Sequence, residues 1–205
     1  MQRSAVTSTA LGRKHDRFYM DPRTIRFMLD DGTLYRVFRQ SFEAHSIAFA
    51  EQYLARSVDN ELIKLPGVSS VDLDRFLSLI YPSELASCDL ETPDEWISAL
   101  RLAHRWSFSA LRARAIQEIQ LGGSAVDRVA AAREFSDLSS LQDWLLPSFM
   151  EACTTNCWLD AVSADDAERL GAGTVLQIAR IREKVFSLTY GYVDVERAIV
   201  DAGLA

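Results

Sequence analysis

The chain has 205 residues, 48% hydrophobic and 25% charged, which is close to the average for folded globular domains and argues against a fibrous or wholly disordered chain. Glycine and proline are scarce, at 9 and 5 residues, so long linker-like tracts are not expected. The 22 basic and 29 acidic side chains give a net charge of −7, and such an acidic body disfavours nucleic-acid binding by the folded part.

The charge is unevenly distributed along the chain. Residues 1–30 carry six basic and three acidic side chains, a balance of +3, so the remainder carries −10. The first fifteen residues hold no acid and several Ser and Thr, which weakly resembles a mitochondrial presequence. A disordered basic tail over residues 1–16 is the interpretation we prefer.

The apolar runs and the cysteines indicate the cellular compartment of the protein. No apolar run approaches the roughly 20 residues that span a bilayer, so no membrane association is expected. The three cysteines, Cys88, Cys153 and Cys157, are too few and too scattered for a disulfide scaffold. Reduced thiols favour a cytoplasmic or nuclear location.

The first predicted element is a β-hairpin. Residues 24–29 and 33–38 have strand-forming side chains, and the Asp31-Gly32 pair between them is typical of a tight turn. Apolar residues fall on both faces, so we expect one face to pack and the other to be partly covered. A helix over residues 41–53 follows, with Ser41 as its N-cap. A short third strand is expected at residues 61–65.

After that strand nearly every segment has helical periodicity. One helix begins at Ser69 or Ser70 and stops at Tyr81-Pro82, because proline cannot continue it. Residues 92–95, Thr-Pro-Asp-Glu, combine an N-cap, a proline at the first helical position and a capping box. A helix after Phe108 ends at Gly122-Gly123, which we take as the internal boundary. Further helices are expected near residues 126–135, 141–153, 164–170 and 175–190. Strands first and helices afterwards predict an α+β fold.

A search for catalytic groups finds no nucleophile elbow, phosphate-binding loop or dinucleotide fingerprint. His15, His45 and His104 lie far apart in sequence and are interpreted as packed or surface imidazoles. Cys153 and Cys157 are four residues apart, but no further Cys or His follows at zinc-site spacing. We therefore expect no catalytic, metal or cofactor site.

The remaining polar and aromatic features have simple structural interpretations. The pair Asp30-Asp31 fits turn chemistry, and Asp165-Asp166 fits a helix start, where carboxylates favour the positive end of the dipole. Gly171-Ala-Gly173 fits a helix stop. The four tryptophans, at positions 96, 106, 144 and 158, are expected to pack in a core or an interface.

Three segments carry a family resemblance. The first is DGTLYRVFRQSFEAHS at positions 31–46 with Phe49 after it, the second is FLSLIYPS at 76–83, and the third is the pair of helices at 96–106 and 108–119. Together they resemble the opening hairpin and helix, a later helix and the closing helical hairpin of a BTB/POZ domain, over residues 17–120. Phe38 stands where many such domains have a histidine, so roles tied to that histidine are not transferred.

The resemblance is closest to the expanded BTB family of mushroom-type fungi. It rests on YPS at 81–83, EWISALRLA at 95–103 and WLLPSF at 144–149. It implies a BTB/POZ-like domain at residues 17–121, with an N-terminal hairpin, a short third strand and surrounding helices. An all-helical C-terminal extension at residues 124–205 would follow.

The resemblance also implies a function. BTB domains are non-enzymatic protein-interaction modules that commonly form homodimers, and some are adaptors for cullin ubiquitin ligases. The residues near a dimer or partner interface would be Phe18, Tyr19, Phe42, His45 and Phe49. The same residues could instead form only the core of the monomer.

Two other hypotheses remain open. One is a transcription-associated regulator acting through partners, with its basic tail, residues 1–26, in contact with DNA. The other is an enzyme whose site is assembled from scattered carboxylates and His104.

Overall fold

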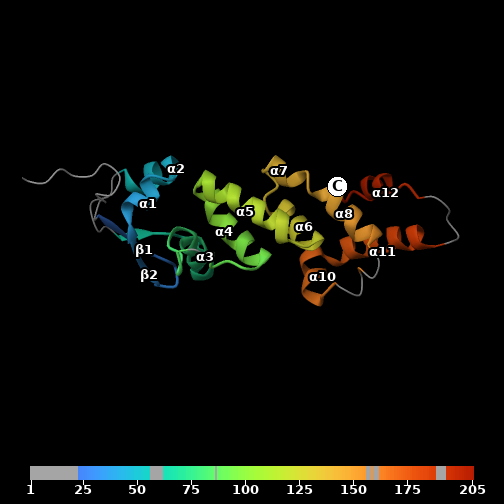
Figure 1. Cartoon of the computed structure of the whole chain (residues 1–205), viewed down its shortest axis with the longest axis horizontal. Helices are drawn as coiled ribbons and strands as arrows, with labels where there is room; N and C mark the ends of the chain where they lie inside the picture. Colours follow the sequence, from blue (N-terminus) through green and yellow to red (C-terminus); the bar gives the residue numbers. More distant parts are fainter. Residues whose placement is uncertain (1–22, 56–61, 86, 156–157, 159–161, 188–192) are drawn as a thin grey trace, which may run out of the picture. The chain divides into compact units, whose positions relative to one another are not determined.

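The computed structural model describes residues 23–55, 62–85, 87–155, 158, 162–187 and 193–205. The chain divides into two compact units, residues 1–67 and 68–205. The first contains a small mixed sheet with short helices and the second is helical (Figure 1), so the predicted α+β class is confirmed. The predicted basic tail at residues 1–16, and Phe18 and Tyr19, lie outside the described residues.

A three-stranded sheet organises the first unit. Its strands are β1 (Thr24–Met28), β2 (Leu34–Phe38) and β3 (Leu62–Lys64), in the order β2-β1-β3. β1 pairs antiparallel with β2 and parallel with β3, so the predicted hairpin and short third strand are confirmed. The turn places Gly32 at φ +86°, a conformation that glycine adopts without strain.

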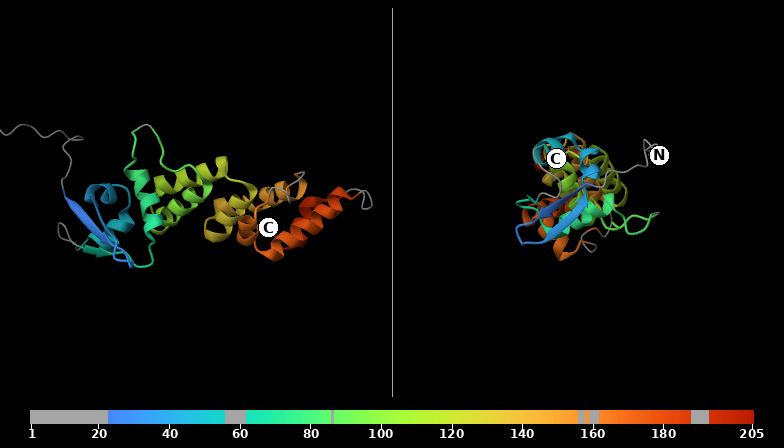
Figure 2. Two further views of the ribbon diagram at one scale, coloured as in Figure 1. Left: turned by 90° about the horizontal axis from the view of Figure 1, so that it is seen from below. Right: turned by 90° about the vertical axis from the view of Figure 1, so that its left-hand side faces the viewer.

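The segment after the hairpin differs from the prediction. A continuous helix capped by Ser41 was expected over residues 41–53, and this is wrong. The chain instead forms α1 (Arg39–Glu43), α2 (Ile47–Phe49) and the π-helical turn η1 (Ala50–Leu54), which lie over one face of the sheet (Figures 1 and 2). The break occurs because the Ser46 side chain caps α2, accepting a hydrogen bond of 3.0 Å from the Phe49 amide.

The described part of the second unit consists of helices, several of which have side-chain N-caps. The helices are α3 (Ser70–Ile80), α4 (Pro93–Arg105), α5 (Ser109–Gly122), α6 (Ala125–Glu134), α7 (Ser139–Gln142), α8 (Leu145–Thr154), α10 (Ala164–Leu170), α11 (Ala172–Phe186) and α12 (Val195–Asp201). Ser69 caps α3, and Thr92 with Glu95 forms the predicted capping box of α4. Gly171, at φ +84°, ends α10 as expected.

Two helical predictions need correction. The helix expected over residues 141–153 is divided into α7 and α8, because Pro147 lacks an amide hydrogen and fits only the first turn of a new helix. Helix α12 was not predicted, although Asp194 caps it through the Arg197 amide at 3.1 Å. Residues 188–190 of the predicted last helix lie outside the described residues.

The Gly122-Gly123 pair lies inside the second unit, between α5 and α6. A Cβ on Gly123 would lie 2.5 Å from the carbonyl oxygen of Ile119, so glycine is required for this close turn. The division into compact units falls instead at Gly67–Val68.

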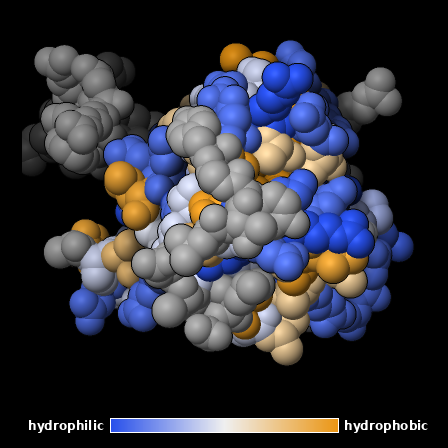
Figure 3. Space-filling model, turned by 90° about the vertical axis from the view of Figure 1, so that its right-hand side faces the viewer, coloured by the Kyte–Doolittle hydropathy of each residue, from blue (hydrophilic) through white to orange (hydrophobic). Residues whose placement is uncertain are grey.

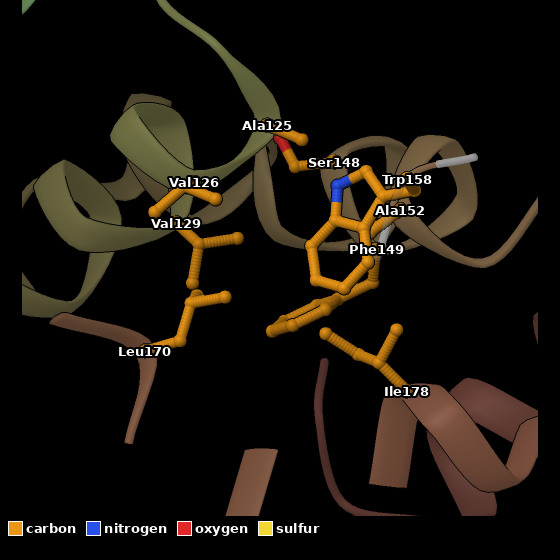
Figure 4. Close-up of a pocket in the computed structure, with 9 residues that line it drawn as sticks. All are labelled: Ala125, Val126, Val129, Ser148, Phe149, Ala152, Trp158, Leu170 and Ile178. Atoms are coloured by element: carbon orange, nitrogen blue, oxygen red, sulfur yellow. The ribbon is translucent and has the colours of Figure 1, made fainter. Parts of the chain in front are cut away.

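Two clusters contain many of the buried apolar side chains in the described part of the second unit. One is built around Trp96, Leu100 and Ile119, and the other around Phe149, Ile178 and Ile199. Figure 4 shows part of the second cluster with two neighbouring residues, Ala125 and Ser148, and these side chains leave no space for a water molecule between them. All four tryptophans are buried, as the sequence predicted.

Candidate interaction surfaces

Two of the predicted interface residues are core residues in this structure. Phe42 and Phe49 have 0% exposure and pack with Phe27, with ring centroids 5.2 and 6.0 Å from that of Phe27 and 4.9 Å from each other. These three rings join α1 and α2 to β1. A partner that docked on this conformation would reach neither Phe42 nor Phe49.

The residues between these two phenylalanines form a surface that we call the α2 ridge. It consists of Ala44, His45, Ile47 and Ala48, all of which are exposed, and Ile47 is 77% exposed. The break at Ser46 produces it, because a new helix start turns Ile47 outward while Phe42 and Phe49 still face the core. His45 is thus the only described member of the predicted interface set that lies at the surface.

The nearly buried side chain of Arg39 connects the two ends of the segment that contains the α2 ridge. Arg39 is 7% exposed, and its Nε donates to Glu43 Oε1 at 2.6 Å while its Nη2 donates to the Leu54 carbonyl at 2.8 Å. Arg23 approaches the same carboxylate at 3.7 Å. These bonds join the start of α1 to the end of η1, so the intervening ridge is held at both ends.

The outer face of the sheet is a second exposed surface, which we call the basic sheet face. It presents alternate residues of the three strands, Thr24, Arg26, Met28, Leu34, Arg36, Phe38, Leu62 and Lys64. Leu34 and Phe38 on β2 are 63% and 53% exposed. The opposite face carries Ile25, Phe27, Val37 and Ile63, which are buried. Among the residues that the structure describes, this inner face is buried, whereas Thr24, Arg26 and Met28 of the basic sheet face are half-buried.

The second unit has a polar hollow of about 530 Å³ lined by residues of α4, α6 and α10. Most of its charged groups bind one another or neighbouring helices. Arg101 forms a two-point ion pair with Glu134 and also contacts Asp72 at 3.2 Å, and hydrogen bonding to Glu134 raises the pKa of Arg101. Arg133 donates to the Leu170 carbonyl at 2.8 Å. These interactions hold helices together and leave the hollow without an evident reactive group.

His104 lies apart from that hollow. Its Nε2 is 3.0 Å from Asp137 Oδ2, while its Nδ1 is buried and has no hydrogen-bond partner in the part of the chain that the structure describes. No group of three or more His, Cys, Asp or Glu side chains is placed to hold a metal ion among the described residues. A single histidine–aspartate contact does not assemble the nucleophile and oxyanion site that acyl transfer requires.

Asp127 and Cys153 are two further groups of the second unit whose pKa values are shifted. Burial alone would raise the pKa of Asp127, but hydrogen bonds from Ser124 and Arg169 outweigh it, and the pKa lies below its ordinary value of 3.8. Burial raises the pKa of the Cys153 thiol to about 11, against a weaker opposing effect of Arg182. Cys153 therefore remains a neutral thiol at pH 7 and is not an activated nucleophile.

Comparison with known proteins identifies no relative of this chain. No family model, curated protein or solved structure matches the chain. Among the described residues, no helix is long and apolar enough to cross a membrane. The fold defines an α+β protein with a small mixed sheet in one unit and a helical second unit, and the likeness to BTB/POZ domains rests on the sequence segments alone.

Proposed function

We propose that this chain is a non-enzymatic protein-interaction module of BTB type that self-associates as a homodimer. The order of elements supports the proposal, since a hairpin, a helical segment, a short strand, a helix and a helical hairpin follow one another as the resemblance implies. The observation that carries it is the exposed Ile47 on the segment that the resemblance assigns to the dimer contact.

The physical argument for self-association is burial of the α2 ridge. A two-fold dimer places the same patch of each copy against the other. Full burial of an isoleucine side chain contributes about 1.5–3 kcal/mol, and a symmetric contact would bury two. Ala44 and Ala48 beside Ile47 are small, so the two backbones can approach closely.

Light scattering over a dilution series tests the proposal with a matched pair of variants. Ile47→Glu puts a charge on the ridge, while a carboxylate in the first turn of α2 is compatible with the helix dipole. Val71→Glu is the control, because Val71 is also an exposed aliphatic residue in the first turn of a serine-capped helix. We expect a dimer at micromolar concentration for the wild type and Val71→Glu, and a monomer for Ile47→Glu. A wild type that is monomeric throughout would overturn self-association.

We further propose that the module acts in the cytoplasm or nucleus as an adaptor, including for a cullin ubiquitin ligase. Affinity purification of the tagged chain from its host, followed by mass spectrometry, tests this. Recovery of a cullin with the wild type would support the adaptor role, and consistent absence of any cullin would remove it.

A further inference from the structure

The basic sheet face has a composition that differs from the rest of the molecule. Its eight residues include three cations, Arg26, Arg36 and Lys64, and no acid, although the whole chain has a net charge of −7. Four of the other residues are apolar: Met28, Leu34, Phe38 and Leu62. A cationic and apolar surface on an acidic protein is complementary to a ligand that is acidic and apolar.

The strand register places two of these cations against each other. Arg26 and Arg36 are direct cross-strand partners on the same face. Like charges directly opposite one another destabilise a sheet. Among the residues that the structure describes, no carboxylate lies within ion-pair distance of Arg36 or Lys64. An anionic group bound beside Arg36 would therefore make a favourable contact with a cation that has no ion-pair partner among the described residues.

The edge of β2 offers backbone groups beside this surface. At the two ends of the hairpin, the Leu29 amide donates to the Thr33 carbonyl and the Arg39 amide donates to the Arg23 carbonyl, each at 3.0 Å. Hydrogen-bonded and non-hydrogen-bonded pairs alternate along an antiparallel ladder. Leu34 and Arg36 therefore direct their N–H and C=O groups away from β1, toward the outer edge of the sheet.

We infer that this edge binds an extended segment of a partner protein in which an acidic residue stands between two apolar ones, in the pattern apolar–x–acid–x–apolar. A strand added beside β2 places alternate side chains next to Leu34, Arg36 and Phe38. The acid then meets Arg36, and the apolar residues meet Leu34 and Phe38. Since the pattern reads the same in both directions, it does not depend on the direction of the added strand. The inference rests on the proposed function and names the class of partner.

Two other occupants fit less well. A second copy of this same face would bring three cations against three, which opposes a symmetric contact. A single-stranded nucleic acid would need aromatic platforms for its bases, and Phe38 is the only aromatic residue of the eight. An acidic, apolar strand uses both the charges and the aliphatic side chains.

Fluorescence anisotropy with a labelled peptide tests the inference on the full chain. The probe is Gly-Ser-Val-Thr-Glu-Thr-Val-Ser-Gly, and the comparison peptide has Lys in place of Glu. Arg36→Glu reverses the central charge and replaces a repulsive cross-strand pair by an attractive one, so the variant should fold. Arg180→Glu makes the same charge change at an exposed position of α11.

We expect saturable binding of the Glu peptide by the wild type and by Arg180→Glu, weakened about tenfold in Arg36→Glu, which corresponds to about 1.4 kcal/mol. The Lys peptide should bind Arg36→Glu better than the wild type. Absence of saturable binding, or equal weakening by Arg180→Glu, would overturn the inference. Tighter, Arg36-dependent binding of a single-stranded oligothymidylate would also overturn it and identify a nucleic-acid surface.

The same experiment separates this inference from the proposed function. Ile47→Glu should bind the Glu peptide as the wild type does, and Arg36→Glu should remain a dimer by light scattering. A wild type that binds the Glu peptide but is monomeric would contradict only self-association. A wild type that is a dimer but does not bind the Glu peptide would contradict only the peptide site.

Discussion

The two units of the chain differ in how their exposed apolar side chains are distributed. The first unit exposes neighbouring apolar side chains, Leu34 and Phe38 on one strand and Ile47 with two alanines on the α2 ridge. The large exposed apolar residues in the described part of the second unit are spread over several elements, for example Val71 on α3, Leu176 and Phe186 on α11, and Val200 on α12. In Figure 3, which faces the end that carries α11 and α12, polar areas separate the apolar ones.

The charged groups show the same contrast. On the basic sheet face of the first unit, the exposed Arg36 and Lys64 lie among apolar residues. In the second unit arginines bridge helices. Arg128 binds the Gly123 carbonyl at 2.6 Å, Ser148 at 3.2 Å and Glu151, and Arg169 binds Asp127 at 2.8 Å. The second unit thus uses these charges for its own packing, whereas the first unit carries both of the surfaces that we propose for binding.

The largest effect on the unfolding free energy is expected for Phe42→Ala, which tests whether this ring belongs to the core of the first unit. A fully buried phenylalanine truncated to alanine costs about 3–5 kcal/mol of unfolding free energy. Urea unfolding should show this loss at concentrations too low for association. The control Ile47→Ala should change the unfolding free energy by less than about 0.5 kcal/mol. A stable Phe42→Ala that lost only self-association would place the ring in an interface instead.

A smaller loss is expected for Arg39→Met, which breaks the support of the α2 ridge. Methionine keeps the apolar stem but leaves Glu43 and the Leu54 carbonyl without their donor, at a cost of about 2 kcal/mol. Thermal unfolding measures it. Arg36→Met on the basic sheet face is the control and should be nearly neutral. Equal effects of the two substitutions would show that the buried arginine has no special role.

The smallest effect is expected in the second unit and depends on pH. Because the folded pKa of Asp127 lies below its ordinary value of 3.8, its contribution to stability is present above that value and is lost as the pH falls through the folded pKa. Asp127→Asn should therefore cost about 1–2 kcal/mol at pH 7 and progressively less below pH 3.8. Urea titrations across pH check it, with the exposed Asp143→Asn as control. If the unfolding free energy lost in Asp127→Asn did not change with pH, the stabilisation would not depend on the charge of Asp127.

Local features of the fold could be predicted from the sequence, and features set by distant contacts could not. Ser69, Thr92 and the Asp31-Gly32 turn act on residues within three or four positions, so their patterns were sufficient. The break at Ser46 was missed because Ser41 has the same capping chemistry. The parallel pairing of β1 with β3 joins segments more than thirty residues apart, which no local pattern specifies.

The α2 ridge lies in the segment that the sequence indicated, but its exposed residues could not be predicted. The sequence indicated the segment around Phe42 and His45, yet apolar spacing alone does not distinguish a buried phenylalanine from an exposed isoleucine. The role of Arg39 depends on the Leu54 carbonyl fifteen residues away. The outer face of the sheet could not be identified, because both faces of the hairpin carry apolar residues.

The most direct test of the account is carbene footprinting of the intact chain at concentrations below and above self-association, read residue by residue by mass spectrometry. The account predicts that labelling of the α2 ridge, above all of Ile47, decreases at the higher concentration, while labelling of Val71, Leu176 and Val200 in the second unit stays constant. Concentration-dependent protection of those second-unit residues, with Ile47 labelled equally at both concentrations, would contradict it.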